Sequence, residues 1–422
     1  MFFSKQASEK KILGLKDLRV LLHEALYNLG PQKKVLALPP DKTRFHSRAG
    51  EITQMIHEFY GNHLADILPA LGTHAPMTKP DIKSMFGDIP HDLFRVHDWR
   101  KDVITLGTLP KEFLHDISDG KVNYSWEAQV NRLLRDGGHD LIINIGQVVP
   151  HEVAGMANFN KNIFVGTGGP KGINKSHFLG AVCNMETIIG RADNPVRALL
   201  NKADSSFSHL LPKMLYILTV IGNDDQGNQG VRGLFIGDDK ECFYKAAGLS
   251  LKENITLLDK PLKKAVVYLD PSEFKSTWIG NKAIYRTRMA MADNSELIIL
   301  APGVNTFGED SEIDRLIRKY GYRGTKYTLN MVQKNKDLNN NLSAAAHLIH
   351  GSSEDRFKIT YCPGGLSRKE IEQANFAFGD LKEMLNKYPP DRMQTGINEI
   401  NGEQIYYIPN PALGLWSEKK RF

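Results

Sequence analysis

Short apolar runs alternate with helix-like segments along most of this chain of 422 residues. The run KVLALPP at residues 34–40 has the length and composition of a buried strand. In the segment after it, Ile52, Met55 and Ile56 recur at helical spacing. Buried strands that alternate with amphipathic helices are typical of parallel sheets that helices cover on both faces. We therefore predict an α/β fold.

Six further apolar runs continue this pattern. They lie at residues 66–72, 93–99, 140–146, 264–270, 296–303 and 357–362. A stretch at residues 194–253 is instead predicted to be helical and rich in loops, and the alternation restarts near residue 262. We therefore predict two domains, 1–262 and 263–422, each a mostly parallel sheet flanked by helices. We expect the first to bind a cofactor and catalyse, and the second to close over an active-site cleft between them.

Composition and charge exclude several classes of protein. With 41% hydrophobic and 24% charged residues, the chain has the composition of an ordinary globular protein. No apolar run reaches the roughly 18 residues of a transmembrane helix. The first residues, MFFSKQASEKKILG, lack the apolar core of a secretory signal. The net charge of +6 is scattered along the chain, so we expect neither nucleic acid nor a membrane as a partner.

The three cysteines, Cys183, Cys242 and Cys362, are widely spaced and form no CxxC pair. This usage predicts buried thiols in a reducing compartment rather than a disulfide framework or a metal site. We therefore expect the protein to work in the cytoplasm.

Ionisable side chains follow each of the first four predicted strands. They are Asp41, Thr43 and Arg44, then Thr73 and His74, then His97 and Asp98, and finally His151 and Lys161. In open α/β sheets, ligands bind just beyond the carboxyl ends of the strands. The sequence therefore predicts one active-site rim that carries these groups, with His97 and Asp98 more typical of a structural pair that closes a turn.

Several chemistries remain open on the residues alone. A zinc hydrolase would have to assemble its histidines through the fold, because the chain has no HExxH motif and no cysteine quartet. A nicotinamide dehydrogenase needs GxGxxG after a strand, but the loop GTGGPKG at residues 166–172 has Lys171 where the third glycine should fall. Schiff-base catalysis by Lys161 is also open, since Phe159 and Phe164 would supply an apolar pocket.

Four motifs bring these residues into one pattern. PPDKTRFHSRAGE at 39–51, LGTHAPMT at 71–78, VHDW at 96–99 and VPHEVAG at 149–155, followed by Lys161 and His177, resemble the lactate racemase family. The resemblance covers most of the first 200 residues. It implies an isomerase, a 2-hydroxy acid racemase or epimerase that uses a nickel-pincer nucleotide, a pyridinium mononucleotide whose ring carbon and two sulfurs hold nickel. Cofactor-maturation proteins are then implied as partners.

The resemblance also implies a role for each matching residue. Lys161 matches the lysine that is joined to the cofactor through a thioamide, and His177 matches the fourth nickel ligand. His74 and His151 match the acid/base pair on opposite faces of the substrate. Arg44 matches the arginine near the substrate carboxylate, and Asp41 is its motif partner and part of the cofactor-binding set. One departure stands out. The family has a serine-glycine-glycine run just before the lysine, whereas this chain has Ala157, Asn158, Phe159 and Asn160.

The implied chemistry requires two bases. Inversion at C2 removes the carbinol hydrogen as hydride on one face and returns it on the other, and each stereoisomer needs its own base for the hydroxyl proton. Histidine titrates near neutrality and can serve as base and then as acid. Nickel suits a field of soft sulfurs, carbon and one imidazole. A planar arginine fork such as Arg44 holds a carboxylate in place.

The favoured substrate is a sugar acid such as gluconate or mannonate. His46, Ser47 and Arg48 follow Arg44 closely, and the amides of the segment ANFN at 157–160 are predicted to bond extra hydroxyls. Racemisation of lactate or malate is the alternative. A non-catalytic relative that binds a nucleotide or a hydroxy acid is a further alternative, which the presence of both Lys161 and His177 disfavours.

Overall fold

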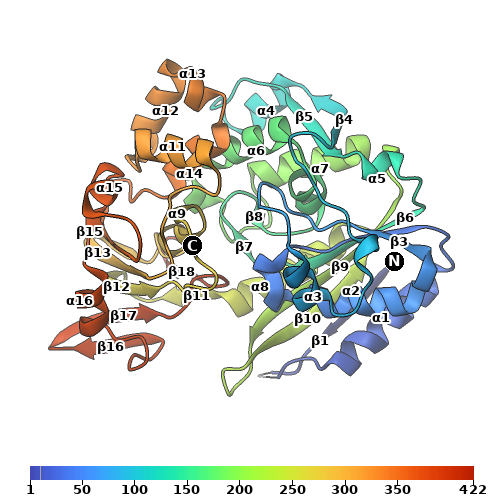
Figure 1. Cartoon of the computed structure of the whole chain (residues 1–422), viewed down its shortest axis with the longest axis horizontal. Coiled ribbons are helices and arrows are strands. Elements are labelled where there is room, and N and C mark those ends of the chain that lie inside the picture. Colours follow the sequence, from blue (N-terminus) through green and yellow to red (C-terminus); the bar gives the residue numbers. More distant parts are fainter. Residues whose placement is uncertain (10) are drawn as a thin grey trace. The chain divides into compact units, whose positions relative to one another are not determined.

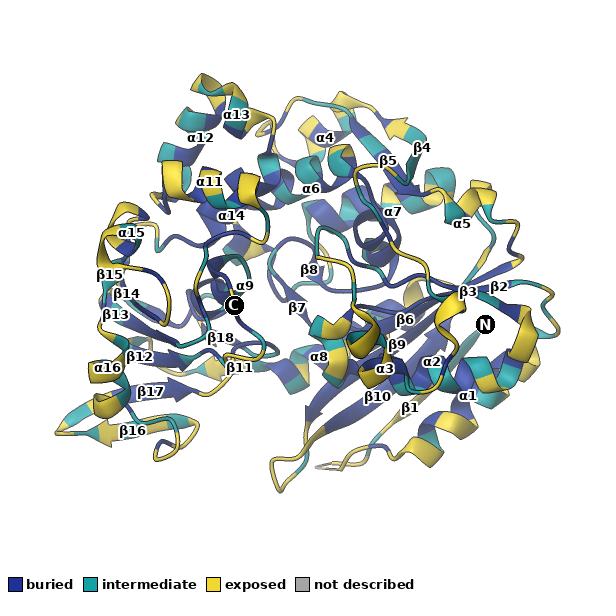
Figure 2. Ribbon diagram, viewed as in Figure 1, coloured by how far each residue is buried: buried dark blue, intermediate teal, exposed yellow. Residues whose placement is uncertain are grey.

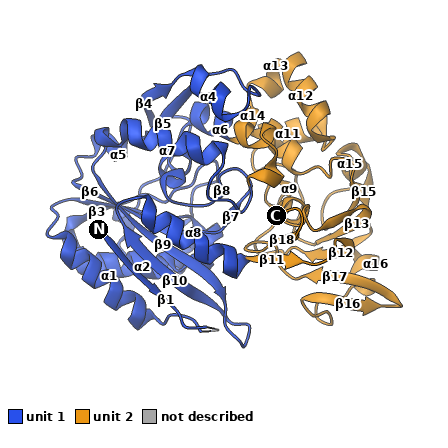
Figure 3. Cartoon of the chain, turned by 180° about the vertical axis from the view of Figure 1, so that it is seen from behind, with its two compact units in different colours: residues 1–176, 189–254 blue, residues 177–188, 255–422 orange. Residues whose placement is uncertain are grey.

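The computed structural model describes residues 1–9 and 11–422 (Figure 1). The chain forms two compact units, each built from two segments of sequence (Figure 3). The first unit comprises Met1–Ser176 and Ile189–Asn254, and the second comprises His177–Ile188 and Ile255–Phe422. Within the described residues, no helix combines the length and the apolar character needed to cross a membrane.

The first unit is organised around a six-stranded sheet. Its strands, in spatial order, are β1 (Phe2–Gln6), β10 (Gln229–Gly237), β9 (Lys213–Asn223), β6 (Leu141–Gln147), β2 (Val35–Leu38) and β3 (Leu64–Ile67). The four strands from β9 to β3 are parallel, and the pairs β1–β10 and β10–β9 are antiparallel. The carboxyl ends of β6, β2 and β3 therefore lie at the same edge.

Amphipathic helices cover this sheet. α2 (Ala49–Tyr60) buries the predicted apolar positions Ile52, Met55 and Ile56 and contacts β6. α8 (Lys240–Asn254) packs on β9 and β10, with Phe243 in a buried cluster. The other helices of this unit are α1 (Leu15–Leu29), α3 (Lys79–Phe86), α4 (Lys111–Ile117), α5 (Leu133–Asp136) and α7 (Pro195–Phe207). Figure 2 shows the central strands buried and the outer helix faces exposed.

The second unit has its own six-stranded sheet. Its order is β15 (Ala377–Phe378), β14 (Phe357–Pro363), β13 (Met291–Ala301), β12 (Leu262–Tyr268), β17 (Glu403–Ile408) and β16 (Gly396–Ile400), and only β16 runs antiparallel to its neighbour. Its helices are α9 (Thr277–Gly280), α10 (Lys282–Tyr285), α11 (Ser311–Tyr320), α12 (Gly324–Lys334), α13 (Lys336–Asn339), α14 (Leu342–His350), α15 (Arg368–Gln373) and α16 (Leu381–Lys387). The predicted α/β class, with mostly parallel sheets flanked by helices, is confirmed.

The short segment His177–Ile188 belongs to the second unit for clear physical reasons. Ala181 packs against Ala346 and Ile349 of α14. Glu186 forms ion pairs with Arg288 and Arg356. The helix α6 (Pro170–Val182) thus begins in the first unit, and its residues from His177 onward belong to the second. The predicted division at residues 262 and 263, which treats each domain as one continuous segment, does not anticipate this exchange, and where the functional domain boundary lies stays a prediction.

Two predicted elements are wrong. Residues 93–99 form no strand, because only Phe94 makes a single bridge to β3 and its ring packs on Phe86. The stretch 194–253 was expected to be helical and loop-rich, yet it contains β9 and β10, the longest pairing of the first sheet. The apolar run in β9 is as compatible with a buried helix as with a strand, and tertiary pairing decides between them.

The cysteines agree with the sequence analysis. Cys183, Cys242 and Cys362 are free and buried. Burial raises the pKa of the Cys242 and Cys362 thiols, so both remain protonated at neutral pH.

Candidate active site at the rim of the first sheet

The ends of β2 and β3 bring Asp41 and His74 into contact. Asp41 caps the short helix η1 (Lys42–Ser47), where its carboxylate accepts bonds from the amide and hydroxyl of Thr43. The His74 Nδ1 lies 2.5 Å from the Asp41 Oδ2. Burial opposes ionisation of Asp41, but His74 and the bonds from Thr43 lower the pKa of that carboxyl to about 2. The ionised carboxylate can only accept, so His74 donates through Nδ1 and leaves Nε2 as its free lone pair.

His151 is held in the opposite sense. It lies in the small hairpin of β7 (Pro150–His151) and β8 (Gly155–Met156), just past the end of β6. Its Nδ1 accepts a bond from the backbone amide of Val153 at 3.1 Å, with the amide of Ala154 at 3.4 Å. A backbone amide can only donate, so the neutral ring of His151 carries its proton on Nε2. The two histidines therefore offer different groups: a lone pair on His74 and an N–H on His151.

Lys161 follows a turn with an unusual backbone. Asn158 and Phe159 have φ values of 66° and 59°, the left-handed region that glycine favours. Lys161 then begins a π-helical turn, η4 (Asn162–Gly166), a feature common at functional sites. The departure in sequence thus keeps a glycine-like backbone.

The amine of Lys161 is desolvated and lies among charged groups. Desolvation and the positive charge of Arg44 together lower the pKa of Lys161 to about 8. The negative charges of Glu152 and Asp41 have the opposite effect but are weaker. Ile163 and Phe164 are buried, and the apolar pocket that they are expected to form around the amine stays a prediction. A lowered pKa makes the amine nucleophilic near neutral pH, which suits both a covalent tether and Schiff-base chemistry.

Two donors near the rim have no acceptor. Arg44 lies in η1, and its Nη1 is buried with no hydrogen-bond partner. Gln147 is the last residue of β6; its Oε1 meets the His46 Nε2 at 3.1 Å, while its Nε2 is buried and unpaired. Unmet buried donors cost free energy, on the order of 1–3 kcal/mol each. An oxygen-rich ligand at this rim would satisfy them.

The amides at 157–160 are mostly committed to the protein. Asn160 is fully buried, accepts from Arg197 and donates to Asn201. The Asn158 Oδ1 accepts from the following backbone amide. Both polar atoms of the Asn160 side chain thus bond to other protein groups, and the expectation that the segment ANFN bonds substrate hydroxyls stays a prediction.

His177 lies in α6 (Pro170–Val182), sixteen residues after Lys161. The helix begins in the first unit, and His177 is the first residue of the segment that packs with the second. Its role as a nickel ligand stays a prediction. Among residues 1–9 and 11–422, no three His, Cys, Asp or Glu side chains gather into a metal site.

The glycine loop at 166–172 is packed rather than open. A side chain at Gly168 would meet the Phe164 carbonyl at 2.2 Å, and one at Gly169 would meet the Gln129 amide oxygen at 2.6 Å. The buried ring of His97 donates from Nε2 to the Gly168 carbonyl and accepts from the Asn131 amide. The loop also follows η4 and not a strand. It therefore lacks the context of a dinucleotide fingerprint, and His97 is the structural residue expected.

Three residues of this region escaped the sequence analysis. Glu152 places its Oε2 3.7 Å from the His151 Nδ1 and acts on the charge of Lys161. Gln147 and Arg197 are the others. Glu152 stands inside a quoted motif and could have been found by its position, whereas Arg197 comes from α7, remote in sequence, and carries no local signal.

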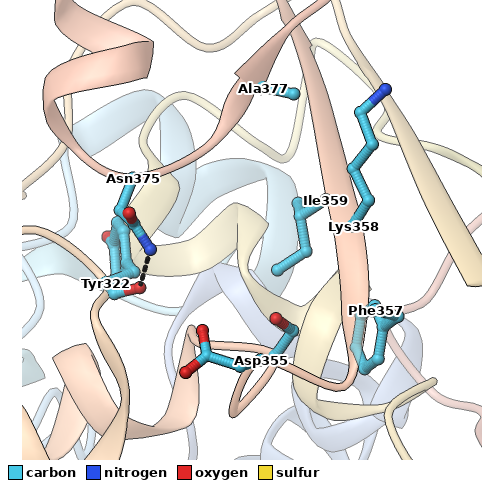
Figure 4. A pocket seen from close by; sticks show the side chains of 8 residues that line it. Tyr322, Asp355, Phe357, Lys358, Ile359, Asn375 and Ala377 are labelled. Carbon is cyan, nitrogen blue, oxygen red and sulfur yellow. Dashed lines mark hydrogen bonds between the residues drawn. The ribbon is translucent and has the colours of Figure 1, made fainter. Parts of the chain in front are cut away.

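A separate cavity of about 310 Å³ lies within the second unit (Figure 4). Its polar groups are largely used by the protein: the Lys358 amine pairs with Glu296, and the Asn375 amide donates to the Tyr322 carbonyl. None of the predicted site residues lines it.

Residues 23–189 match the model of the lactate racemase N-terminal domain. This match identifies residues 23–189 as similar to the N-terminal domain of lactate racemases. The matched range includes each residue that the four motifs singled out, from Asp41 to His177.

Two solved structures share the fold over nearly the whole chain. A crystal structure of a Thermotoga maritima protein aligns with a TM-score of 0.82 and 23% identity, covering 98% of this chain and 100% of that one. The lactate racemase apoprotein of Thermoanaerobacterium thermosaccharolyticum aligns with a TM-score of 0.71 and 18% identity, covering 95% and 93%. At these identities the likeness concerns the fold. A comparison with curated proteins finds no significant match.

The reactivity of Lys161 gives a direct test of this geometry. With a pKa of about 8, roughly half of the Lys161 amines are neutral at pH 8, against well under 1% for an ordinary lysine near 10.5. We expect an amine-acylating reagent at pH 8 to modify Lys161 before exposed lysines such as Lys171, with an apparent pKa near 8 by peptide mass spectrometry. A profile that rises only above pH 10 would contradict the desolvated environment.

Proposed function

We propose that this protein inverts C2 of a 2-hydroxy acid, as a racemase or epimerase that uses a nickel-pincer nucleotide. The supporting observation is a group of side chains at one rim of the first sheet: Asp41, Arg44, His74 and Lys161. Glu152 connects His151 to this group, because its carboxylate lies near the His151 ring and acts on the charge of Lys161. Each is a residue that the family motifs single out. A site that only bound a hydroxy acid would not need a desolvated amine among these charges.

The residues present fit the proposed cofactor. Lys161 offers a nucleophilic amine for the tether, and His177 is the imidazole that would hold the nickel. When bound, the group would supply an acceptor for the C2 hydrogen as hydride and return it to either face. We also propose cytoplasmic maturation proteins as the source of the cofactor.

The two histidines would move the hydroxyl proton. His74 has a free Nε2 lone pair, and Asp41 stabilises the imidazolium that forms when it accepts a proton. The neutral ring of His151 must first shift its proton from Nε2 to Nδ1, away from the bond with Val153. The proton would stay on Nδ1, and the Glu152 carboxylate, 3.7 Å away, would stabilise it there. His74 is therefore the more readily available base.

Arg44 would orient the substrate. Its buried, unpaired Nη1 is positioned to donate to a carboxylate, and a planar guanidinium fixes both carboxylate oxygens. With the carboxylate held, the reacting carbon keeps its place while its configuration changes, and such positioning is worth several powers of ten in rate.

For the substrate we propose a sugar acid such as gluconate or mannonate, with lactate or malate as the alternative. The unpaired Nε2 of Gln147, beside His46, supports this choice because it offers a donor beyond those that a small hydroxy acid needs. The Asn160 amide no longer supports it. Gln147 takes over the role that the sequence analysis gave to that amide.

Nickel content tests the proposed anchor. Protein from cells that make the cofactor should carry nickel, and Lys161→Ala should lose it because no tether can form. His177→Ala should keep the nucleotide but hold nickel more weakly. Elemental analysis of purified protein measures this, and Lys171→Ala, a nearby exposed lysine, is the control. Nickel at the wild-type level in Lys161→Ala would rule out the anchor role.

Turnover tests the two histidines. His74→Ala and His151→Ala should each lower kcat/KM by about 10²- to 10⁴-fold. The equilibrium constant fixes the ratio of kcat/KM in the two directions, so the unequal roles should appear in kcat and KM separately. The control is His63→Ala, whose ring is exposed and bonds only the Lys33 carbonyl. Full activity in either site variant would remove that histidine from the acid/base pair.

A substrate panel tests the sugar-acid proposal. Gluconate, mannonate, lactate and malate are compared by loss of optical purity, first with the wild type and then with Gln147→Leu. Loss of one hydrogen bond to a hydroxyl should lower kcat/KM for the sugar acids about 10- to 100-fold and leave lactate nearly unchanged. Equal losses for both substrates, or a wild type that prefers lactate, would favour the alternative.

A further inference from the structure

The turn before Lys161 is strained. Asn158 and Phe159 are consecutive residues at positive φ. Asparagine tolerates this region, but for a residue with a large side chain it is strained. A turn of this kind persists only when its surroundings hold it. Since Lys161 follows two residues later, the same surroundings decide where its amine points.

The guanidinium of Arg197 donates hydrogen bonds to residues on both sides of Asn158 and Phe159. From α7, its Nη2 donates to the Met156 carbonyl at 2.6 Å and its Nη1 donates to the Asn160 Oδ1 at 2.5 Å. Asn160 in turn donates to Asn201, one helical turn further along α7. The helix therefore holds the turn at the residues that flank Asn158 and Phe159.

Aromatic packing also supports the turn at Asn158 and Phe159. The Arg197 guanidinium lies 4.3 Å from the centre of the Phe243 ring. Phe159 stacks on that ring with its centre 5.2 Å away, and it packs at a tilt against Tyr216 with its centre 4.3 Å away. The strained residue and the guanidinium thus share one aromatic support, which stabilises both.

Arg197 has features that an ordinary buried ion pair does not explain. Its side chain is 1% exposed, and within residues 1–9 and 11–422 no carboxylate lies at ion-pair distance from it. Burial lowers its pKa to about 10. Burying a cation against carbonyl and amide oxygens alone is costly, so the site gains something other than stability from it.

We propose that Arg197 is a positioning residue for Lys161: by clamping Met156 and Asn160 it holds the left-handed turn at Asn158 and Phe159 that aims the amine into the rim. Its charge acts in the same direction, since Arg197 also disfavours the protonated form of Lys161. The clamp replaces the freedom that glycines have at these positions. The inference rests on the proposed anchoring role of Lys161.

The test measures Lys161 itself, without the cofactor. In Arg197→Lys the charge stays but the two-pronged clamp is lost. The apparent pKa of Lys161, read from the pH dependence of acylation by peptide mass spectrometry, should rise from about 8 toward 10.5. At pH 8 the rate of modification should fall about 10- to 100-fold as the neutral fraction falls. Asn160→Ala, which removes one acceptor only, should give a smaller shift in the same direction.

The matched control is Arg232→Lys. Arg232 is also buried in the first unit and also donates to backbone carbonyls, those of Ser8 and Lys11. It should lower the melting temperature comparably while leaving the Lys161 profile near 8. If Arg197→Lys folds and keeps a pKa near 8, or if Arg232→Lys shifts it equally, Arg197 is a structural residue only and the inference is overturned.

This outcome is separable from failure of the proposed function. Should Lys161→Ala retain nickel while Arg197→Lys still shifts the amine, the clamp stands and the anchor role falls. Should Lys161→Ala lose nickel while Arg197→Lys leaves the amine unchanged, the anchor stands and the clamp falls.

Discussion

Three parallel strands end at one edge of the first sheet, and the candidate site depends on that shared edge. β2, β3 and β6 lie side by side and deliver Asp41, His74 and His151 from positions far apart in sequence. No local motif could place them together. The parallel direction is itself a consequence of buried apolar strands joined by helices, so the chemistry rests on the packing of the sheet.

Hydrogen-bond partners, rather than residue type, distinguish the two histidines. The ionised carboxylate of Asp41 makes the Nδ1 of His74 a donor, whereas a backbone amide makes the Nδ1 of His151 an acceptor. The pair is thereby unequal before any ligand enters. A symmetric reaction can run on an unequal pair, because the equilibrium constant restricts only the ratio of the overall rates in the two directions.

The turn before Lys161 has a left-handed backbone conformation at residues that are not glycine. Asn158 and Phe159 have the positive φ that glycine favours, and Arg197 and stacked aromatic rings support them. The larger side chains add buried surface but need external support. The polar atoms of Asn160 serve that support, which is why they are not available to a ligand.

The sequence by itself determined the α/β class, the strands at 35–38, 141–147 and 357–363, the buried cysteines and the similarity to lactate racemases, because periodicity and motif spacing are local properties. It did not determine β9 and β10, since an apolar run fits a buried helix as well as a strand. Only the tertiary structure decided that His97 braces a glycine loop, that Glu152 faces the site, and that Arg197 holds the turn before Lys161. The physical reason is that hydrogen bonds and burial depend on groups distant in sequence, and one sequence carries no record of which distant groups meet.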